Sequence, residues 1–250
     1  MTEKGATPRF GTPHRHFRQI DSTNTVAREL ATAGAPHGTV VTADEQTAGR
    51  GRQGRTWTAP PGAALLYSAI VRPLGPRHSV LPLTVALAVC EVAEQLRPGV
   101  ECKVKWPNDI HLDGRKLAGI LIESRPQDGW AVIGVGLNLA IPADDFPPEL
   151  RDRATSLFDG RGGVRNTRDA YMTNSASAAL SERLDAWLGA DAEQVLDAWR
   201  DRDALRGREV NCEKGSGVAE GINERGYLVV RLADGDRVAL GAGDVHLTSF

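Results

Sequence analysis

The chain has 250 residues, of which 41% are hydrophobic and 25% are charged, and its formal net charge is −2. This is the composition of a soluble globular protein that is long enough for one large domain or two unequal ones. The almost balanced charge excludes a protein held to nucleic acid or to an anionic membrane by bulk charge alone. We expect no membrane-spanning segment, because Pro82 and Thr84 interrupt the most apolar stretch, residues 80–90.

The cysteines and the N-terminus bear on the cellular compartment in which the protein is found. Three cysteines without metal-like spacing argue against a disulfide scaffold and against a zinc site, and they are Cys90, Cys102 and Cys212. The N-terminus has no apolar run of the kind that a secretory signal needs. We therefore expect a reducing, cytoplasmic location and no metal held by the protein itself.

The N-terminal part of the chain predicts strands and helices in alternation. Residues 1–15 show no periodicity and are expected to form a mobile tail, which a short strand over residues 16–20 follows. Side chains that suit a helix N-cap come next, at residues 21–24, and a helix is expected to run from there to Gly34. The elements that follow are strands over residues 38–44 and 65–72 and a long apolar helix over residues 79–96.

The rest of the chain predicts an antiparallel meander, two helices and a small unit built only of strands. The meander has four strands, over residues 100–105, 110–112, 116–123 and 130–139. The helices are expected over residues 167–188 and 191–203. From Leu205 onward, five short strands separated by turn residues indicate a small β-barrel.

These elements predict an α+β chain in three parts. The parts are the tail of residues 1–15, a main domain of residues 16–204 and a barrel of residues 205–250. A unit as small as this barrel has a marginal core, so we expect it to dock on the main domain.

A loop rich in glycine and arginine, residues 49–55, is the first candidate binding element. It contains the G-x-G-x-x-G pattern of dinucleotide-binding folds, but Pro60-Pro61-Gly62 follows where such a fold needs a helix. Its three arginines are suited to phosphate or carboxylate, which accept bidentate guanidinium contacts. A solvated surface loop, or an Arg-Gly segment for RNA, explains the same residues equally well.

Lysines gather beside a predicted hairpin. Lys103 and Lys105 precede the segment Trp106-Pro107-Asn108-Asp109, and Lys116 follows the turn signal Asp113-Gly114. A lysine that leaves a hairpin can be aimed into a cleft by the strand that follows, and its compact charge suits several oxygens of one centre. We favour such a role for Lys116, whereas we expect Lys103 to point to water.

Two further segments place glycines or polar groups where a ligand could approach. Gly134 and Gly136 lie within a predicted strand and precede Asn138, which indicates close approach of a ligand or of another backbone. A bulge and a hydrogen-bonded core asparagine are at least as good an explanation. Residues 21–24 and 44–46 gather hydroxyls and amides that suit a neutral amide or urea, although helix capping and turns also explain them.

Four segments, taken together, resemble the signature of the biotin–protein ligase family. In chain order they are DSTN (21–24), TADEQTAGRGRQGRTW (42–57), KWPNDIHLDGRKLAGILIE (105–123) and IGVGLNLA (133–140). Each segment alone is a weak signal, but their order and spacing match the family, and the resemblance extends from about residue 16 to the C-terminus.

The resemblance implies an ATP-dependent ligase. Such enzymes join biotin to ATP, which gives biotinoyl-5'-AMP and pyrophosphate. They then pass the biotinoyl group to one lysine of an acceptor, such as the biotin carboxyl carrier domain of an acyl-CoA carboxylase. The expected ligands are biotin, ATP and Mg²⁺. The expected fold is a class II synthetase-like catalytic domain, with a mixed, mostly antiparallel sheet and flanking helices, beside the small C-terminal barrel.

The resemblance also implies roles for individual residues. The biotin-binding set is Ser22, Thr23, Asn24, Gln46, Gly49, Arg50, Gly51, Arg52 and Lys116, in which Arg50 would meet the biotin carboxylate. The ATP-binding set is Arg52, Arg55, Trp57, Lys105, Asn108 and Asn138, in which Trp57 would pack on adenine. The catalytic set is Lys116, Arg52 and Asp109. Arg52 would help to retain the adenylate, and Asp109 could help to take the proton of the acceptor lysine.

The N-terminus departs from many bacterial relatives, which begin with a DNA-binding helix-turn-helix domain. Only about fifteen residues precede the first predicted strand of this chain. We therefore expect a monofunctional ligase without that domain, with no DNA partner, as a monomer or a weak dimer.

The implied chemistry requires positive charge. A carboxylate must approach the α-phosphate of ATP, and two like charges about 4 Å apart repel by roughly 4 kcal/mol at an effective dielectric constant of about 20. The cations available to offset this repulsion, together with Mg²⁺ that arrives with ATP, are Arg50, Arg52, Arg55, Lys105 and Lys116. A loose Gly/Arg loop that orders over the reactive anhydride would also exclude water from it.

Three alternatives stay open on the sequence alone. A lipoate–protein ligase shares the catalytic fold, but it needs a long apolar slot instead of a pocket for a ureido ring. A nucleic-acid-binding module would use the Arg-Gly segments 49–55 and 160–165, although the net charge opposes it. A non-catalytic biotin sensor would bind the acid without forming an adenylate.

Overall fold

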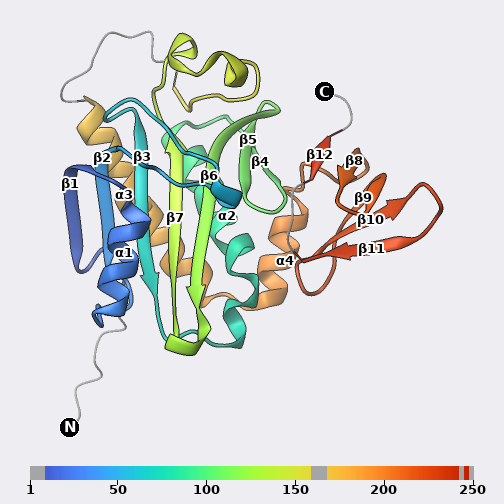
Figure 1. The fold of residues 1–250 in the computed structure, drawn as a ribbon, viewed down its shortest axis with the longest axis horizontal. Coiled ribbons are helices and arrows are strands. Elements are labelled where there is room, and N and C mark those ends of the chain that lie inside the picture. The colour runs from blue at the N-terminus through green and yellow to red at the C-terminus, as the bar shows by residue number, and fades with distance from the viewer. Residues whose placement is uncertain (1–8, 159–167, 242–244, 248–250) are drawn as a thin grey trace.

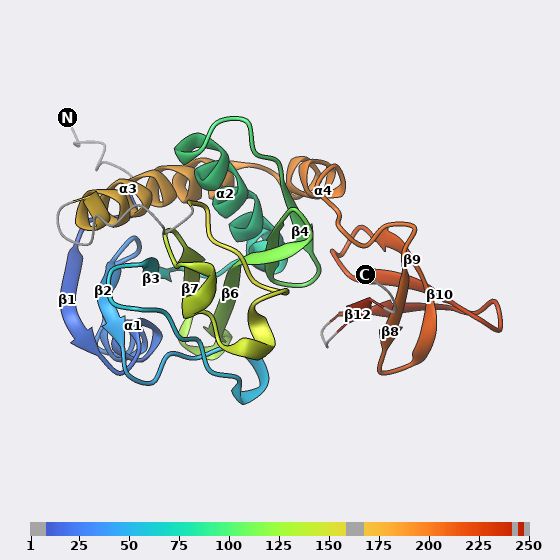
Figure 2. The ribbon, with the colours of Figure 1, turned by 90° about the horizontal axis from the view of Figure 1, so that it is seen from above.

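The computed structural model describes residues 9–158, 168–241 and 245–247. A seven-stranded mixed sheet carries helices on both faces, and a five-stranded antiparallel sheet lies beside it (Figure 1). Helix α1 (Thr23–Thr32) covers one face of the large sheet, while α2 (Leu81–Leu96) and α3 (Arg168–Gly189) cover the other (Figure 2). The predicted α+β class, with a mixed sheet and flanking helices, is therefore confirmed.

The large sheet has the strand order β1-β2-β3-β7-β6-β5-β4. Its strands are β1 (His14–Ile20), β2 (Val40–Gln46), β3 (Ala64–Val71), β4 (Cys102–Lys105), β5 (Asp109–Leu112), β6 (Arg115–Arg125) and β7 (Trp130–Asn138). Only β1 and β2 are parallel, and all other neighbours are antiparallel. The predicted meander is confirmed as β4 to β7, which are consecutive in the chain and adjacent in the sheet.

Helix α2 is the central helix of the main core. Its apolar residues are buried on nearly every side, between the sheet and α3, as expected of a helix without a polar face. Pro82 lies in its first turn, where the missing N–H costs no hydrogen bond. By length and composition the segment 78–96 is apolar enough to cross a membrane, so our expectation that no segment qualifies is wrong. However, 67% of that apolar window is buried inside the fold, which is the environment of a core helix.

The N-terminal residues are more ordered than their composition predicts. Phe10 is only 6% exposed, its ring packs edge-on against His37, and its backbone N–H donates to Asp185 Oδ1 at 3.1 Å. Strand β1 begins at His14, two residues earlier than expected. The predicted tail of residues 1–15 is therefore too long, because residues 9–15 belong to the fold, and residues 1–8 lie outside the described part of the chain.

The C-terminal sheet follows the predicted order of short strands. Its strands are β8 (Glu209–Cys212), β9 (Gly215–Ile222), β10 (Leu228–Leu232), β11 (Arg237–Leu240) and β12 (His246–Leu247), in the order β11-β10-β9-β8-β12. The predicted small β-barrel takes the form of an antiparallel sheet in the described residues, where no pairing joins β11 to β12.

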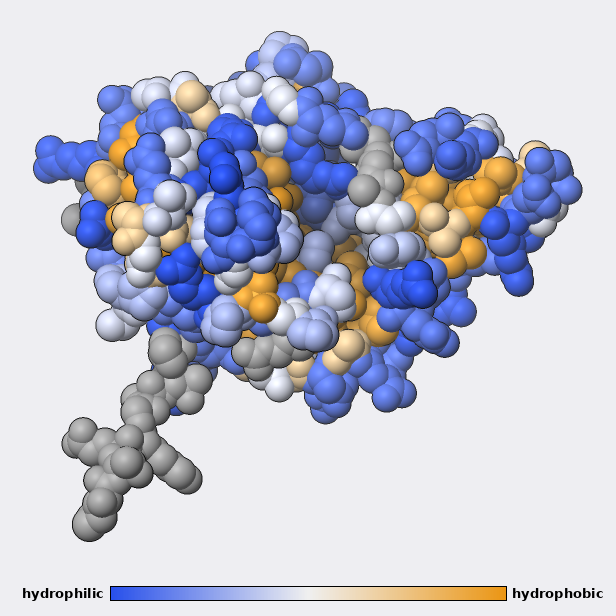
Figure 3. Space-filling view, turned by 60° about the horizontal axis from the view of Figure 1, so that its bottom comes forward, coloured by the Kyte–Doolittle hydropathy of each residue, from blue (hydrophilic) through white to orange (hydrophobic). Residues whose placement is uncertain are grey.

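The small sheet docks on the main domain through hydrogen bonds and a shared core. Helix α4 (Ala192–Arg200) leads to a linker in which Arg202 O accepts from Val104 N at 2.7 Å, so the linker extends the edge of β4. Trp106 is 3% exposed, and its Nε1 donates to Gly226 O at 3.1 Å. On the face drawn in Figure 3, the surface is mostly hydrophilic and hollowed near its centre, and apolar side chains show on the C-terminal sheet.

Substitution of Trp106 by phenylalanine tests this docking contact. The ring stays apolar, but Gly226 O loses its donor, so we expect W106F to lower the free energy of unfolding by about 1–3 kcal/mol in urea titrations. The matched control is W199F, because Trp199 is fully buried and its Nε1 has no hydrogen-bond partner in the described structure. A loss in W106F no larger than the loss in W199F would contradict the docking role.

Candidate active site

The candidate site lies where the end of β2 meets the start of α1 and the loop of residues 47–63. Thr47 N donates to Ile20 O and Ala48 N donates to Asp21 O, each at 2.9 Å, so the loop leaves β2 beside the helix N-terminus. The N–H groups at this helix start are already engaged, because Ser22 N donates to Asp21 Oδ1 and Thr23 N donates to Gln46 Oε1. The chain thus brings the predicted segments 21–24 and 44–46 together.

Polar side chains gather at this junction in a mostly buried, mutually hydrogen-bonded cluster, which we call the polar pocket. Ser22, Thr23 and Asn24 are 2%, 4% and 4% exposed. Ser22 occupies the N-cap position, but its hydroxyl makes no capping bond. Instead, the Gln46 side-chain oxygen accepts from Thr23 N at 2.7 Å and from Thr23 Oγ1 at 3.0 Å. Capping by Ser22 therefore does not explain this segment, and the pocket alternates donors and acceptors.

Ser68 of β3 completes the pocket and was missed by the sequence analysis. It is fully buried, and its Oγ lies 2.7 Å from Thr23 Oγ1 and 2.6 Å from Asn24 Oδ1. The signal was present, because Ser68 is the one hydroxyl of small size within the apolar run ALLYSAIV. A buried hydroxyl in such a run needs a polar partner.

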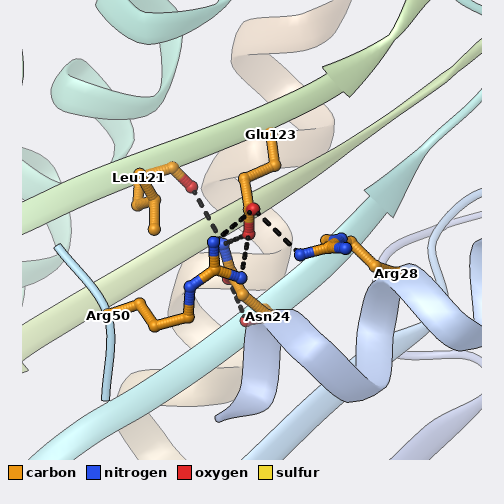
Figure 4. Close-up of polar contacts among 6 residues, drawn as sticks. Asn24, Arg28, Arg50, Leu121 and Glu123 are labelled. Carbon is orange, nitrogen blue, oxygen red and sulfur yellow. Dashed lines mark hydrogen bonds and ion pairs between the residues drawn. The ribbon is translucent and has the colours of Figure 1, made fainter. Parts of the chain in front are cut away.

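A carboxylate on β6, that of Glu123, connects the pocket to the Gly/Arg loop (Figure 4). Glu123 Oε2 accepts from Asn24 Nδ2 at 2.8 Å, and Oε1 lies 3.2 Å from Arg28 Nη1. The same Oε1 lies 3.0 Å from Arg50 Nη2. Two arginines, one from α1 and one from the loop, thus share one carboxylate, and the sequence analysis identified neither Arg28 nor Glu123.

The Gly/Arg loop is folded into a narrow, hairpin-like arch. Gly51 N donates to Arg55 O at 2.7 Å and Trp57 N donates to Gly49 O at 2.9 Å. A Cβ on Gly49 would lie 2.2 Å from Trp57 O, so only glycine fits at this crossing. The loop therefore has more internal order than its composition predicts.

The loop places Trp57 over two strand glycines. Gly119 and Gly136 are paired across β6 and β7, and a Cβ on Gly136 would lie 2.4 Å from Trp57 Cε2. The Lys116 ammonium lies 5.8 Å from the ring centroid, within the range of a cation–π contact. Trp57 Nε1 is buried over Gly136 without a hydrogen-bond partner in the described structure.

Positively charged side chains surround the Asp109 carboxylate near Trp57. Lys116 Nζ lies 2.7 Å from Asp109 Oδ1, and Lys105 faces Asp109 across the β4–β5 pair. Arg52 Nη1 donates to Asn108 Oδ1 at 3.0 Å. The Asp109 carboxylate thus faces two lysines, and Arg52 of the loop binds the preceding residue, Asn108. The cluster therefore carries an excess of positive charge.

The pKa values of these groups reflect burial and mutual repulsion. Burial lowers the pKa of Lys105, and Lys116, Arg153 and Arg55 lower it further, against the attraction of Asp109. Burial also lowers the pKa of Arg52, with Asp109 acting in the opposite direction and Arg55 in the same one. Because the positive forms are disfavoured in this cluster, a bound anion would be stabilised by it.

The positive cluster extends toward the C-terminal sheet. Burial lowers the pKa of His246 in β12, and Lys105, Arg55 and Arg153 lower it further. Arg153 was missed by the sequence analysis, and it is held near Lys116 because Lys116 N donates to Arg153 O at 2.8 Å. No local motif marks Arg153, so only the fold could reveal it.

Two predicted residues lie apart from this arrangement. Asn138 is 4% exposed, and its Nδ2 donates to Thr155 O at 2.9 Å, which is the behaviour of a hydrogen-bonded core asparagine. Its role in binding ATP stays a prediction. Lys103 pairs with Glu101 and donates to Asp201 O, away from the cluster, as the solvent-facing interpretation predicts.

The site therefore has two ends. One is a buried pocket of neutral donors and acceptors, and the other is a crowded cation cluster, with Arg50 and Trp57 between them. An excess of positive charge beside neutral hydrogen-bonding groups is suited to anionic ligands that also carry a neutral polar part.

Comparison with known proteins identifies the family. Residues 16–139 match the biotin/lipoate A/B protein ligase family, and residues 206–247 match the biotin protein ligase C-terminal domain. A biotin–[acetyl-CoA-carboxylase] ligase of Mycobacterium tuberculosis is 34% identical over 250 residues, which cover 92% of this chain and 90% of that protein. The chain belongs to the biotin protein ligases of the biotin/lipoate ligase family.

Two further relatives define how far the likeness extends. A bifunctional ligase/repressor BirA of Bacillus spizizenii is 43% identical over 147 residues, which cover 57% of this chain and 45% of that protein. The chain thus spans less than half the length of that relative. A solved biotin protein ligase of Aquifex aeolicus, in complex with biotin and ATP, is 26% identical with a TM-score of 0.75, and the match covers 94% of this chain and 97% of that one.

Substitution of Gly136 by alanine tests the seat of Trp57. The new Cβ would overlap the indole ring, so we expect G136A to displace Trp57 and to lower the free energy of unfolding by about 1–3 kcal/mol. Urea titration and the near-ultraviolet circular dichroism of tryptophan measure the two effects. The control is G75A, because nothing lies within 4 Å of a Cβ there and Gly75 has an extended backbone. Equal behaviour of G136A and G75A would refute the close contact.

His111 predicts a pH dependence of stability. The pKa of His111 is lowered from its ordinary value of 6.5 to about 4, chiefly by burial and with a contribution from Lys105 and Lys116, while Asp109 and a hydrogen bond with Gly114 O act in the opposite direction. Between these pH values the unfolded chain binds more protons, so stability falls as the pH falls from about 6.5 to about 4. We expect H111N to lose less stability than the wild type between pH 7 and pH 5 in urea titrations. An equal loss would contradict the assignment.

Proposed function

We propose that this protein activates biotin with ATP and transfers the biotinoyl group to one lysine of a biotin carboxyl carrier domain. The observation that carries the proposal is the cation cluster around Asp109, with Lys116 2.7 Å away, beside a buried pocket of neutral polar groups. The names of the relatives agree with it, since the Aquifex enzyme is described with biotin and ATP and the Mycobacterium enzyme as a ligase for acetyl-CoA carboxylase.

The polar pocket suits the ureido ring of biotin. A cyclic urea has one carbonyl acceptor and two N–H donors. The buried side chains of Thr23, Asn24 and Ser68 and the half-buried Gln46 supply hydroxyl and amide groups of both kinds, which now bond to one another and would exchange those bonds for bonds to the ring. A buried donor or acceptor rejects a ligand that leaves it unpaired. Lipoate carries no such polar ring, so this pocket favours biotin over lipoate, and isotope exchange between ATP and pyrophosphate with each acid separates them.

The first step joins two anions. A carboxylate oxygen of biotin bonds to the α-phosphorus of ATP, the bond from that phosphorus to the β-bridging oxygen breaks, and pyrophosphate leaves with the electron pair. Lys116, Lys105 and Arg52 would neutralise the approaching carboxylate and the leaving phosphates, since they already stand close to one another. Their mutual repulsion is relieved as negative charge accumulates, which stabilises the transition state.

The second step transfers the acyl group. The neutral amine of the acceptor lysine bonds to the acyl carbon, the bond from that carbon to the AMP oxygen breaks, and AMP leaves. The proton of the amine passes to a base. We propose Asp109 for this role, because its carboxylate contacts Lys116 and would lie beside the reacting carbon.

ATP would lie over Trp57 and the cation cluster. Trp57 offers an aromatic face, which suits a base. Mg²⁺ is a hard cation that keeps phosphate oxygens and water as ligands. The oxygens of Asn108 and Asp109 are engaged with Arg52 and Lys116, so we propose that the phosphates bring Mg²⁺ and supply most of its ligands.

The partners and location follow from the same reaction. We propose a carboxyl carrier domain as the macromolecular partner, no DNA partner, and a monomer or weak dimer. The Gly/Arg loop supports this over a nucleic-acid-binding module, because Arg50 is paired with Glu123 and Arg52 with Asn108. Segment 160–165, the other Arg-Gly stretch, lies outside the described residues. A cytoplasmic location agrees with three cysteines that form no disulfide.

The proposal is tested by incubation with ATP, Mg²⁺, biotin and a purified carrier domain, followed by intact mass measurement. We expect the carrier to gain one biotinoyl group, and we expect K116A to slow pyrophosphate release by about a hundredfold or more. The control is K103A, which removes one lysine that faces away from the cluster. An unmodified carrier, with no pyrophosphate released, would contradict the activity, and wild-type rates in K116A would contradict the role of Lys116.

A further inference from the structure

The carboxylate of Glu123 is the point at which three parts of the site meet. Its oxygens contact Asn24 of the polar pocket, Arg28 of helix α1 and Arg50 of the Gly/Arg loop (Figure 4). The Glu123 side chain is 21% exposed, against 36% for Arg28 and 42% for Arg50. The carboxylate is thus more enclosed than either of the two arginines that contact it, and the loop arginine is the more accessible of the two.

Arg50 already directs both terminal nitrogens of its guanidinium at Glu123. Its guanidinium contacts Glu123 through Nη2 at 3.0 Å and Nη1 at 3.5 Å, with both donors on one acceptor group. A substrate carboxylate that binds Arg50 would come close to Glu123 and be repelled by it. Binding of the substrate acid therefore favours the separation of Arg50 from Glu123.

Arg28 lowers the free-energy cost of separating Arg50 from Glu123. A partly enclosed carboxylate that loses its only cation is strongly destabilised. Glu123 keeps Arg28 at 3.2 Å and the Asn24 amide at 2.8 Å after Arg50 leaves, so its charge stays balanced. The contact with Asn24 also means that the same carboxylate orients a side chain of the polar pocket.

We propose that Glu123 is a positioning residue that holds Arg50, and with it the Gly/Arg loop, on β6 until the substrate carboxylate takes its place. Arg28 is the cation that stays with Glu123 throughout. The inference rests on the proposed function in one respect, namely that the acid that reaches Arg50 is biotin.

Trypsin digestion of the ligand-free protein tests the hold on the loop. The loop offers cleavage after Arg52 and Arg55, and cleavage follows the population of the open form when reclosing is fast. We expect E123Q, which removes the charge but keeps an oxygen for Asn24, to raise the cleavage rate after these arginines about tenfold. R50Q should raise it equally, and E123Q should add nothing further to R50Q.

The matched control for these digests is E29Q. Glu29 is an exposed acid on the same helix as Arg28, so E29Q removes one negative charge outside the site. Cleavage in E123Q at the rate of E29Q would overturn the proposal. Because R50Q alters only a half-exposed loop side chain, it keeps the test decisive if E123Q does not fold: unchanged cleavage in R50Q would overturn the proposal as well.

A pair of ligands tests the exchange of carboxylates. Biotinol carries a hydroxymethyl group in place of the carboxylate of biotin and should gain nothing from a released Arg50. We expect E123Q to tighten the dissociation constant of biotin several-fold relative to wild type, and to leave that of biotinol unchanged, in calorimetric titrations. An equal change for both ligands would mean that Glu123 acts only through Asn24 and the pocket, and it would overturn the exchange.

The two proposals fail in different ways. Absence of biotin binding by the wild-type protein would contradict the proposed function, while the ligand-free digests would still decide whether Glu123 holds the loop. Normal biotin binding, with digests of E123Q and R50Q that match E29Q, would leave the proposed function standing and would overturn the role of Glu123.

Discussion

Crowded positive charge around a single carboxylate is the constraint on which the rest of the site depends. Lys105 and Lys116 both face Asp109, and Arg52 reaches the neighbouring Asn108. Such a cluster costs folding free energy in the absence of a ligand, because burial and like charges disfavour the protonated forms. The meander holds the two lysines at this spacing, because Lys105 on β4 and Lys116 on β6 lie on the strands that flank Asp109 of β5. The same cost becomes binding energy when two anions arrive.

Glycines, which have no side chain, shape the site as much as the charged residues do. Gly119 and Gly136 form a paired depression in the sheet that admits the indole of Trp57, and Gly134 leaves space for the Asn24 amide, which a Cβ would approach within 2.2 Å. The loop crosses itself at Gly49 for the same reason. Glycines within strands weaken a sheet, so their presence at these positions is explained by the groups that lie on them.

Local patterns predicted the strands well and the contacts between distant segments poorly. Alternation and turn signals placed the strands of the meander within two residues of their observed bounds. The motifs predicted Lys116, Asp109 and Gln46 as site residues that the fold brings to one region. Glu123 and Arg28 were missed because they are 95 residues apart in the sequence, and only the fold brings their side chains into contact. The pairing of the outermost strands of the C-terminal sheet could not be predicted, because turn signals report where strands end and not whether the outermost strands meet.

The hydrogen bond between Trp106 and Gly226 links the small sheet to the turn that carries Asn108 and Asp109. Asn108 is in turn held by its own amide, which donates to Ile120 O at 2.9 Å. Trp106 and Asn108 therefore belong to one short turn that is hydrogen-bonded to the small sheet on one side and to β6 on the other. A displacement of the small sheet would pull on the same turn from which Asn108 meets Arg52 of the loop.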